Sequence, residues 1–259
     1  MKRSVEKKMI SFAAVLVLAF SASGADLLNA DFQGAATTDL LPLTAAQRNV
    51  ILDSGTSIGS WADNSSAVNT LYKIAEDETG NKVLVFSSIN NMPTLADADF
   101  TAAADLSINE LIVSWDWMHA DEGGGGTGEA IIELLDSSDQ ALFEVRWVDG
   151  GSLHVAGTGL GVFKRELPGV ATTVLSSSNW DPLAMQLKLT DSAMEVSVGG
   201  VVQTNLVGVY TGVSGLRFKS TSNRSYSHGG MWIDNIRAEL IPLTGLPGIR
   251  LYTIQNATP

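Results

Sequence analysis

Four polar side chains near the middle of the chain have types suited to acid–base chemistry: Glu133, Glu144, Arg146 and His154. Two carboxyl groups about 5–5.5 Å apart can hydrolyse a glycosidic bond with retention of configuration, and a pair about 6.5–9.5 Å apart can do so with inversion. Eliminative cleavage of an acidic glycan instead needs a neutraliser, a base and an acid, which Arg146, His154 and Tyr226 could supply. Either reaction depends on how the surrounding elements place these side chains.

Three segments around these residues are predicted to form neighbouring β-strands. Apolar and polar residues alternate over 130–136, 141–148 and 153–156, and a period of two is typical of strands that bury one face. The four polar residues share the solvent side. The apolar side, directed into a core, consists of Phe143, Val145, Trp147, Leu153 and Val155.

The first turn decides which polar residues face each other. A two-residue turn at 137–138 places Glu129 opposite Arg146, with Glu133 and Glu144 diagonal on the same face. A cross-strand salt bridge of this kind explains the pattern without any function, since such a pair contributes only about 0.2–1 kcal/mol.

The second turn, at 149–151, is predicted to contain three residues with a glycine in the left-handed conformation. This geometry places Arg146 opposite His154 and Trp147 opposite Leu153. A two-residue turn would push His154 into the core and is therefore rejected.

Residues 1–25 have the features of a secretory signal peptide. Four basic residues precede an apolar run from Met9 to Ala22, and Ser23 to Ala25 offers small residues for a peptidase. The apolar run is shorter than the roughly 20 residues that a bilayer-spanning helix needs. We therefore expect a protein that is exported to the periplasm or the cell exterior, with no membrane span after cleavage.

The charge of the chain restricts its partners. The net charge is −12, and removal of the signal peptide takes away four basic residues and one acidic residue, which gives −15. Such a field repels nucleic acid and polyanionic glycans, whereas it admits neutral polysaccharides and divalent cations. The chain contains no cysteine, which excludes disulfides, thiol catalysis and cysteine–zinc sites.

Short alternating segments punctuated by turns predict an all-β fold, a two-sheet antiparallel sandwich, over residues 26–240. A short helix is expected over Thr44 to Val50 with Thr44 as its cap, and residues 241–259 are expected to form a tail. The predicted strands are 27–33, 70–76, 82–88, 111–119, 130–136, 141–148, 153–156, 183–189, 194–198, 215–220 and 231–240.

Several strand sequences resemble the concanavalin A-like or laminin G-like jelly rolls of secreted bacterial proteins over about residues 80–240. They are FEVRW (143–147), WDPLAMQLKL (180–189), EVSVGG (195–200) and MWIDNIRAEL (231–240), and LLNADFQG (27–34) resembles the first strand of jelly-roll carbohydrate-binding modules. The resemblance implies two curved antiparallel sheets, with glycans bound on the concave face or at the rim loops.

The catalytic motifs of the related enzymes do not appear. Concanavalin-like glucanases carry Glu-x-Asp-x-x-Glu on one strand, whereas EAIIELLD (129–136) has isoleucine in place of the middle carboxylate. The paired arginines, Gln-x-His and Tyr-Phe-Lys runs of sandwich-fold alginate lyases are also missing. Glu133, Glu144, Arg146 and His154 are therefore only weak catalytic candidates.

Sugar binding asks for an aromatic platform beside planar polar groups. Trp61 and the loop 222–230 could form such a rim site, although a plain polar connection explains the loop equally well. The predicted ligand-binding residues are Trp180, Asn223, Arg224, Tyr226 and His228.

Asp31 and Asp234 form a candidate metal site. In jelly rolls of this kind the first and last strands are often neighbours, which would bring these two carboxylates together. Calcium prefers several hard oxygen ligands, so the pair with backbone carbonyls could hold a structural calcium ion. Capping of a turn or simple solvation explains exposed aspartates as well.

The sequence thus predicts a secreted, non-catalytic carbohydrate-binding or cell-surface sandwich protein whose partner is a glycan. A polysaccharide-degrading enzyme of the same fold, hydrolase or lyase, is one alternative, and a structural surface protein without a small ligand is another. The sequence carries no signal for the oligomeric state.

Overall fold

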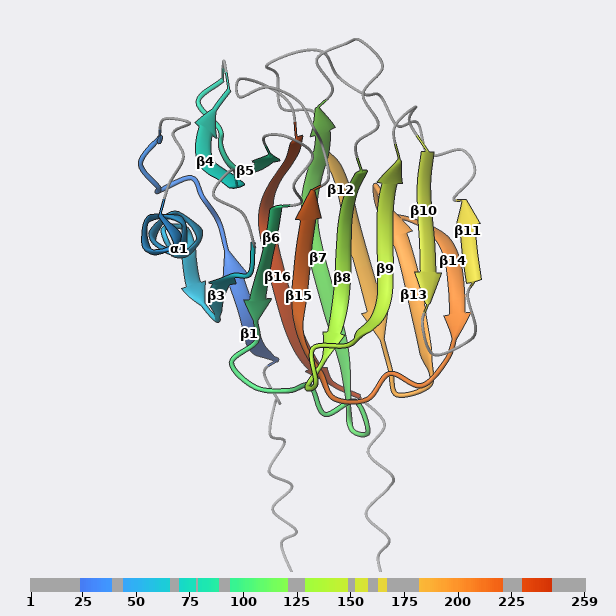
Figure 1. The fold of residues 1–259 in the computed structure, drawn as a ribbon. Coiled ribbons are helices and arrows are strands. Elements are labelled where there is room, and N and C mark those ends of the chain that lie inside the picture. The colour runs from blue at the N-terminus through green and yellow to red at the C-terminus, as the bar shows by residue number, and fades with distance from the viewer. Residues whose placement is uncertain are drawn as a thin grey trace, which may run out of the picture.

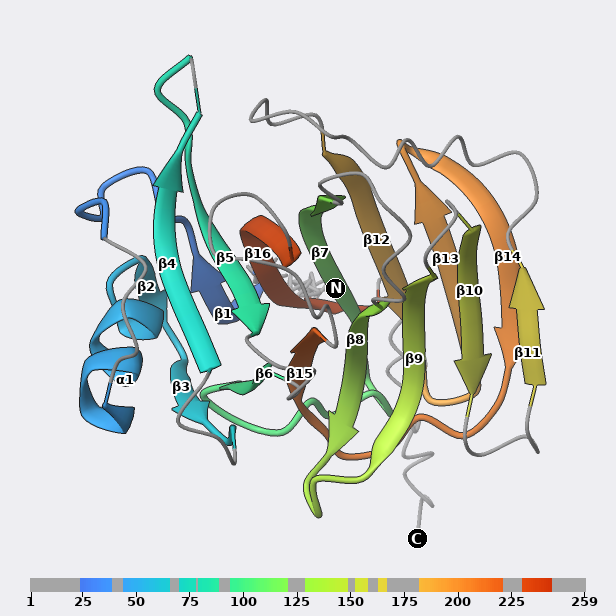
Figure 2. The same cartoon turned by 45° about the horizontal axis from the view of Figure 1, so that its top comes forward.

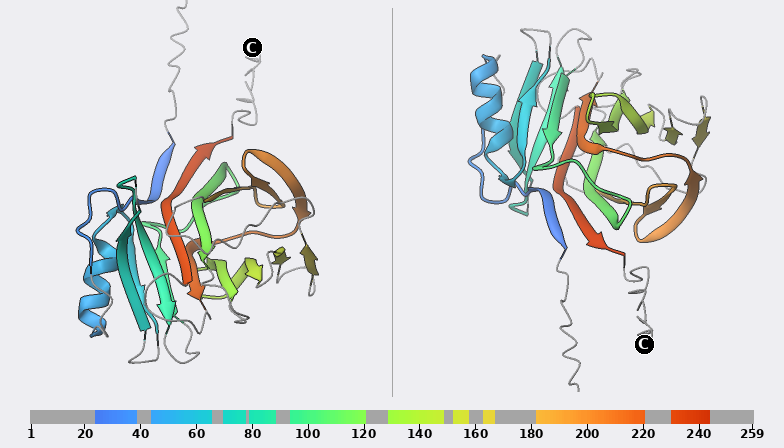
Figure 3. Two further views of the ribbon diagram at one scale, coloured as in Figure 1. Left: turned by 90° about the horizontal axis from the view of Figure 1, so that it is seen from above. Right: turned by 90° about the horizontal axis from the view of Figure 1, so that it is seen from below.

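A computed structural model describes most of the chain between residues 24 and 243, in ten segments. Two antiparallel sheets pack face to face (Figures 1 and 3), so the two-sheet sandwich predicted from the sequence is confirmed. Among the described residues no helix is long and apolar enough to cross a membrane. The segments are 24–38, 44–65, 70–77, 79–88, 94–120, 129–148, 152–157, 163–166, 182–220 and 230–243.

The nine-stranded sheet contains the first and last strands of the fold, which lie side by side. Its main order is β14 (Val201–Val207), β13 (Ala193–Val198), β12 (Leu183–Leu189), β7 (Asn109–Ala120), β16 (Gly230–Pro242), β1 (Ala25–Ala30) and β2 (Thr56–Ile58). The hairpin of β4 (Thr70–Glu76) and β5 (Lys82–Ser88) joins this sheet through pairing of β5 with β16.

The seven-stranded sheet contains the hairpins singled out from the sequence. Its order is β11 (Phe163–Glu166), β10 (Ser152–Gly157), β9 (Ala141–Val148), β8 (Glu129–Asp136), β15 (Val213–Ser220), β6 (Thr94–Asp99) and β3 (Ser60–Asp63). Figure 2 shows β8 to β10 in front of β12 and β13, so consecutive hairpins of the chain form the two facing layers.

The core between the sheets takes every second side chain, as predicted. Phe143, Val145, Trp147, Leu153 and Val155 are all buried in one cluster. A run of edge-to-face indoles crosses the two sheets: Trp115 lies 6.5 Å from Trp117, and Trp117 lies 5.3 Å from Trp147.

Trp61 does not lie at a rim. It is buried beside Phe86 and Phe218, and its indole N–H donates to Thr56 Oγ1 at 2.7 Å. The expectation of a sugar platform there is wrong, because β3 was not predicted and its alternation turns this ring inward.

Helix α1 (Ala45–Asp53) begins at the predicted cap. Thr44 accepts a hydrogen bond from the Gln47 backbone, while the Gln47 side chain accepts one from the Thr44 backbone, a reciprocal capping box. Arg48 on this helix forms a 2.6 Å ion pair with Asp63 at the end of β3. The pair fixes the helix against the edge of the sandwich, next to β3 and β4 (Figure 3).

The turn between β8 and β9 has three residues, where the sequence analysis expected two. The Asp136 N–H donates to the Gln140 carbonyl at 2.9 Å, and the Asp139 N–H donates to the Asp136 carbonyl at 3.0 Å. Asp139 has φ 58°, a left-handed conformation that a short aspartate side chain tolerates better than most residues.

This turn changes the pairing between β8 and β9. Glu133 lies directly opposite Glu144, and Glu129 lies opposite Val148. The predicted Glu129–Arg146 rung is therefore wrong. A shift of two residues keeps every side chain on its predicted face, so the hydrophobic pattern fits both registers equally. The β9–β10 register, with Arg146 opposite His154, is confirmed.

Candidate functional site

A line of charged residues crosses the outer face of the seven-stranded sheet. Asp97 on β6 pairs with Arg217 on β15, Arg217 pairs with Glu133 on β8, and Glu133 pairs with Glu144 on β9. These four residues, called the charged row below, occupy one register position on four adjacent strands. They alternate with core residues, so their side chains point away from the sandwich interior.

The two carboxylates predicted from the sequence lie directly opposite each other in the charged row. Side chains directly opposite in an antiparallel pair have Cβ atoms about 4.5–5.5 Å apart. Burial raises the pKa of the Glu133 carboxyl; Arg217 and Lys219 lower it, and the charge of Glu144 raises it, with a net rise above the ordinary value. Glu133 therefore takes up a proton more readily than an exposed glutamate.

Each acid of the charged row has a basic partner. Arg217 donates from Nε and Nη2 to the two oxygens of Asp97 at 2.8 and 2.9 Å, and its Nη1 lies 3.7 Å from Glu133 Oε2. The hydrogen bonds to Asp97 raise the pKa of Arg217 further. Arg146 Nη2 donates to Glu144 Oε1 at 3.0 Å. The two-point contact between Arg217 and Asp97 fixes the planes of both side chains.

His154 extends this surface onto β10. It lies opposite Arg146 and is half-buried. The structure thus brings Glu133, Glu144, Arg146 and His154 onto one face, as predicted. Asp97 and Arg217 were missed because they lie on strands far away in the sequence, and no local pattern links β6 and β15 to the β8–β9 hairpin.

Aromatic residues on the described parts of these strands face the interior. Phe143, Trp147 and Phe218 all belong to the core cluster, as does Trp61. The outer face therefore offers fixed hydrogen-bonding groups without a stacking platform within the described segments. The predicted rim residues Trp180, Asn223, Arg224, Tyr226 and His228 lie outside the described residues, and their role stays a prediction.

The predicted metal pair lies where β1 ends beside β16. Asp31 is exposed, whereas Asp234 is 1% exposed and accepts hydrogen bonds from the Phe32 N–H at 3.1 Å and from Gln33 Nε2 at 2.9 Å. Burial raises the pKa of Asp234; its hydrogen bonds oppose the rise, and the charge of Asp31 adds to it.

These contacts give both oxygens of Asp234 an N–H donor. Over the described segments, no group of three or more His, Asp or Glu side chains is arranged to hold a metal ion. Calcium binding at Asp31 and Asp234 stays a prediction that needs backbone carbonyls or water to complete the ligand set.

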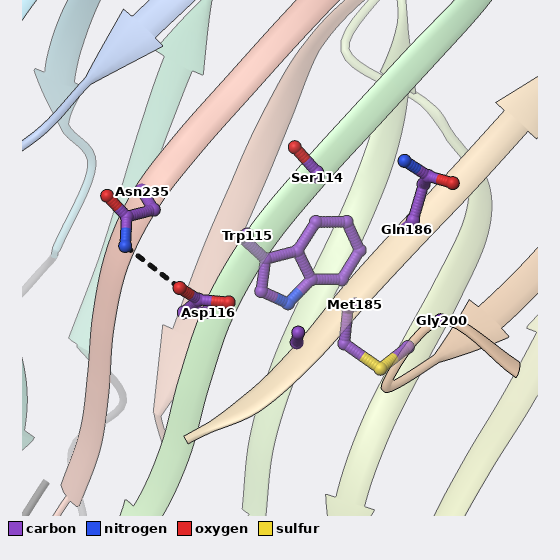
Figure 4. Close-up of a pocket in the computed structure, with 8 residues that line it drawn as sticks. Ser114, Trp115, Asp116, Met185, Gln186, Gly200 and Asn235 are labelled. Atoms are coloured by element: carbon purple, nitrogen blue, oxygen red, sulfur yellow. Dashed lines mark hydrogen bonds between the residues drawn. The ribbon is translucent and has the colours of Figure 1, made fainter. Parts of the chain in front are cut away.

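A pocket of about 320 Å³ lies on the outer face of the nine-stranded sheet (Figure 4). Asn235 closes one side, donating from Nδ2 to Asp116 Oδ2 at 2.8 Å, and has φ 53° where β16 bulges against β7. Gln186 stands across from them. The lining residues are Ser114, Trp115, Asp116, Ala184, Met185, Gln186, Gly200 and Asn235.

This pocket was not predicted from the sequence, although the spacing of two isoleucines on β16 is a signal of it. Ile233 and Ile236 both belong to the core between the sheets although they are three positions apart, and a regular strand with a period of two would direct them to opposite faces. The extra residue marks a β-bulge, and a bulge re-aims side chains. The uninterrupted alternation assumed for 231–240 hid it.

The molecule has the concanavalin A-like jelly-roll fold that the strand sequences resemble. No protein-family model matches the chain, and no curated protein matches it by sequence. Solved structures that are similar to it include the following two, each with a TM-score above one half.

One of them is described as a sialidase. It superposes with a TM-score of 0.53 and 14% sequence identity, and the match covers 83% of this chain and 18% of that protein. The other is the GlcNAcα1-4Gal-releasing endo-β-galactosidase from Clostridium perfringens. It superposes with a TM-score of 0.51 and 10% sequence identity, and the match covers 90% of this chain and 66% of that protein. The chain thus spans only part of either protein, and at these identities the likeness establishes the fold alone.

Proposed function

We propose that this is an exported, non-catalytic glycan-binding protein that holds a neutral polysaccharide against the charged row and the neighbouring Arg146 and His154. The observation that carries the proposal is the set of ion pairs on this face: Arg217 of β15 pairs with Asp97 of β6 and Glu133 of β8, and Arg146 pairs with Glu144 within β9. These pairs fix carboxylate and guanidinium groups on the outer surface of the sheet, where they can exchange hydrogen bonds with sugar hydroxyls.

The charge of the molecule supports a neutral ligand. Arg146 and Arg217 each lie beside a carboxylate, so their positive charges are balanced and attract a uronate or sulfate only weakly. The net charge of −12 repels polyanions at longer range. The ligand that this face is expected to bind is therefore an uncharged polymer of hexoses.

A glycoside hydrolase is a second candidate, which one observation favours. Glu133, whose pKa burial raises, lies opposite Glu144, which is paired with Arg146, and two neighbouring carboxyl groups are what hydrolysis uses. Against it, Arg217 and Arg146 already engage these carboxylates. The two proposals can be distinguished because hydrolysis releases new reducing ends from the polysaccharide, whereas binding alone does not.

The test is retention on immobilised polysaccharides together with assays for new reducing ends and new double bonds. We expect retention on at least one neutral polysaccharide and no product in either assay. Glu144→Gln should weaken that retention about tenfold or more, since hydrogen bonds to charged groups contribute about 1.5–3 kcal/mol. Added calcium or a chelator in the same assay tests the Asp31–Asp234 prediction.

Matched controls come from the opposite sheet. Glu195 pairs with Lys188 at 3.5 Å on the outer face of the nine-stranded sheet, so Glu195→Gln should leave retention unchanged. Loss of retention in Gln186→Ala but not in Glu144→Gln would move the binding site to the pocket. If the unmodified protein releases reducing ends and Glu133→Gln does not, the protein is a hydrolase. If no polysaccharide is either retained or cleaved, a structural role is favoured.

A further inference from the structure

Exposed apolar side chains concentrate on one strand. Seven large apolar residues of the described chain are exposed, and four of them lie within Val201–Val209, on β14 and just after it. They are Val201 (62% exposed), Val202 (49%), Val207 (75%) and Val209 (72%). Scattered apolar residues on a surface need no explanation, but a cluster marks an interaction surface.

The same strand is an edge of its sheet. β14 is the last strand of the main path, and within the described part of the chain it pairs only with β13. One side of its backbone thus presents N–H and C=O groups to a further strand. The other main-path end, β2, has three residues, whereas β14 has seven and offers a longer template.

Two usual protections of an edge strand, charged side chains and proline, are missing, and the protection that β14 does have is a bulge against β13 between Val202 and Thr204. Edge strands commonly carry lysine, other charges or proline to prevent pairing. No Asp, Glu, Lys, Arg or Pro occurs between Glu195 and Arg217, an uncharged run of 21 residues in a chain that is 17% charged. An edge that is long, apolar and uncharged is suited to a partner strand.

The charge distribution indicates which partner. Two copies of a chain with net charge −12 repel each other over most of their surfaces. β14 is the stretch where a second copy meets no fixed charge, and the apolar valines of each copy can cover those of the other. A basic peptide would find more attraction elsewhere on this acidic surface.

We propose that β14 pairs antiparallel with β14 of a second copy of this chain, which joins the two nine-stranded sheets into one continuous sheet. The two-fold axis of an antiparallel pair stands normal to the sheet, so the contact is isologous and closes at a dimer. Both charged rows then face the same side of the dimer. If the proposed glycan binding holds, the dimer binds one polymer at two points.

The experiment is molar mass by light scattering during size-exclusion chromatography, over micromolar to near-millimolar protein. We expect twice the chain mass of 27.4 kDa at the upper end, before any removal of residues 1–25. Raising the salt should strengthen the dimer, because it screens repulsion between the copies while leaving the neutral contact intact.

Two variants with the same chemistry separate the edge from general surface effects. Val207→Lys places a charge on β14 and should give a monomer. Val50→Lys places the same charge on α1, where Val50 is 70% exposed, and should leave the dimer intact. Equal effects of the two variants, or a monomer at every concentration, would overturn the proposal.

Amide hydrogen exchange provides an independent readout. Amides of β14 that point away from β13 should exchange more slowly as protein concentration rises, and those of β2 should not change. Exchange that is independent of concentration in a sample of doubled mass would show that the copies meet elsewhere. Neither measurement requires a glycan, so failure of this proposal is distinct from failure of the binding function.

Discussion

The two outer faces of the sandwich handle buried acids in different ways. In the charged row, Asp97 and Glu133 share the guanidinium of Arg217. Around the bulge of β16, Asp234 is held by a backbone N–H and the amide of Gln33, and Asp116 by the amide of Asn235. The first arrangement balances charge with charge, whereas the second surrounds acids with neutral donors. The first therefore depends on its cation, whereas the second depends on N–H donors that carry no charge.

The largest expected effect is that of Arg217→Ala in the charged row. It leaves two half-buried or buried carboxylates without their cation. Breaking a buried ion pair costs about 3–5 kcal/mol, and because the Arg217 side chain is 21% exposed we expect about 2–4 kcal/mol of lost unfolding free energy. Urea denaturation measures it. Arg237→Ala, which removes an exposed pair with Asp26, should cost at most about 1 kcal/mol. Equal losses of unfolding free energy in Arg217→Ala and Arg237→Ala would show that the charged row depends on its cation no more than an exposed ion pair does.

Asp234 tests the neutral-donor arrangement. Asp234→Ala leaves the Phe32 N–H and the Gln33 amide without acceptors in a buried position, a loss of about 1–3 kcal/mol. Asp234→Asn keeps one of the two acceptors and should therefore lose less stability than the alanine variant. Thermal or urea unfolding of both variants checks this. An asparagine variant as unstable as the alanine variant would show that the negative charge itself is needed, as a bound cation would require.

Asn235 tests the bulge. Its φ of 53° is left-handed, a region that costs a residue with an ordinary side chain about 1–2 kcal/mol. Asn235→Ala should therefore destabilise the protein by about 1 kcal/mol, and Asn235→Gly by less, although both remove the contact to Asp116. Comparison of the two unfolding midpoints separates backbone strain from the lost hydrogen bond. If glycine were the worse of the two, the contact rather than the conformation would hold the bulge.

The smallest expected effect is a pH dependence in the charged row. A carboxyl whose pKa is raised on folding, as burial raises that of Glu133, stabilises the folded state at low pH, and this contribution falls as pH rises from the ordinary value of 4.5 through the raised one. Glu133→Gln should therefore become more stable relative to the unmodified protein between mildly acidic and neutral pH, by up to about 0.5 kcal/mol. The opposite slope would mean that Arg217 outweighs burial.

The fold was largely predictable because alternation shows directly which side chains enter the core. Strands β4, β5, β9 and β12 have the predicted bounds, and Thr44 caps α1 as expected. Strands β2, β3, β6, β11 and β14 were missed, since most of them are short and several lack a clean apolar alternation. TLADAD of β6, for example, buries residues of both faces.

The candidate site was predictable only where it is local. The β9–β10 register followed from one requirement, that His154 stay out of the core. The β8–β9 register did not, because a shift by two residues satisfies the same requirement and only Asp139 in its left-handed conformation decides it. Arg217 reaches Asp97 across 120 residues of sequence, a pairing that depends on how whole strands are ordered in the sheet.

The packed indoles of Trp115, Trp117 and Trp147 give the protein an internal optical reporter. Trp117 lies on one layer and Trp147 on the other, with rings 5.3 Å apart and nearly perpendicular. Exciton coupling between such rings gives a near-ultraviolet dichroism that vanishes when the layers separate, even if each sheet keeps its strands. Loss of that signal before loss of the far-ultraviolet strand signal would reveal a state in which the sandwich has opened while its hairpins persist.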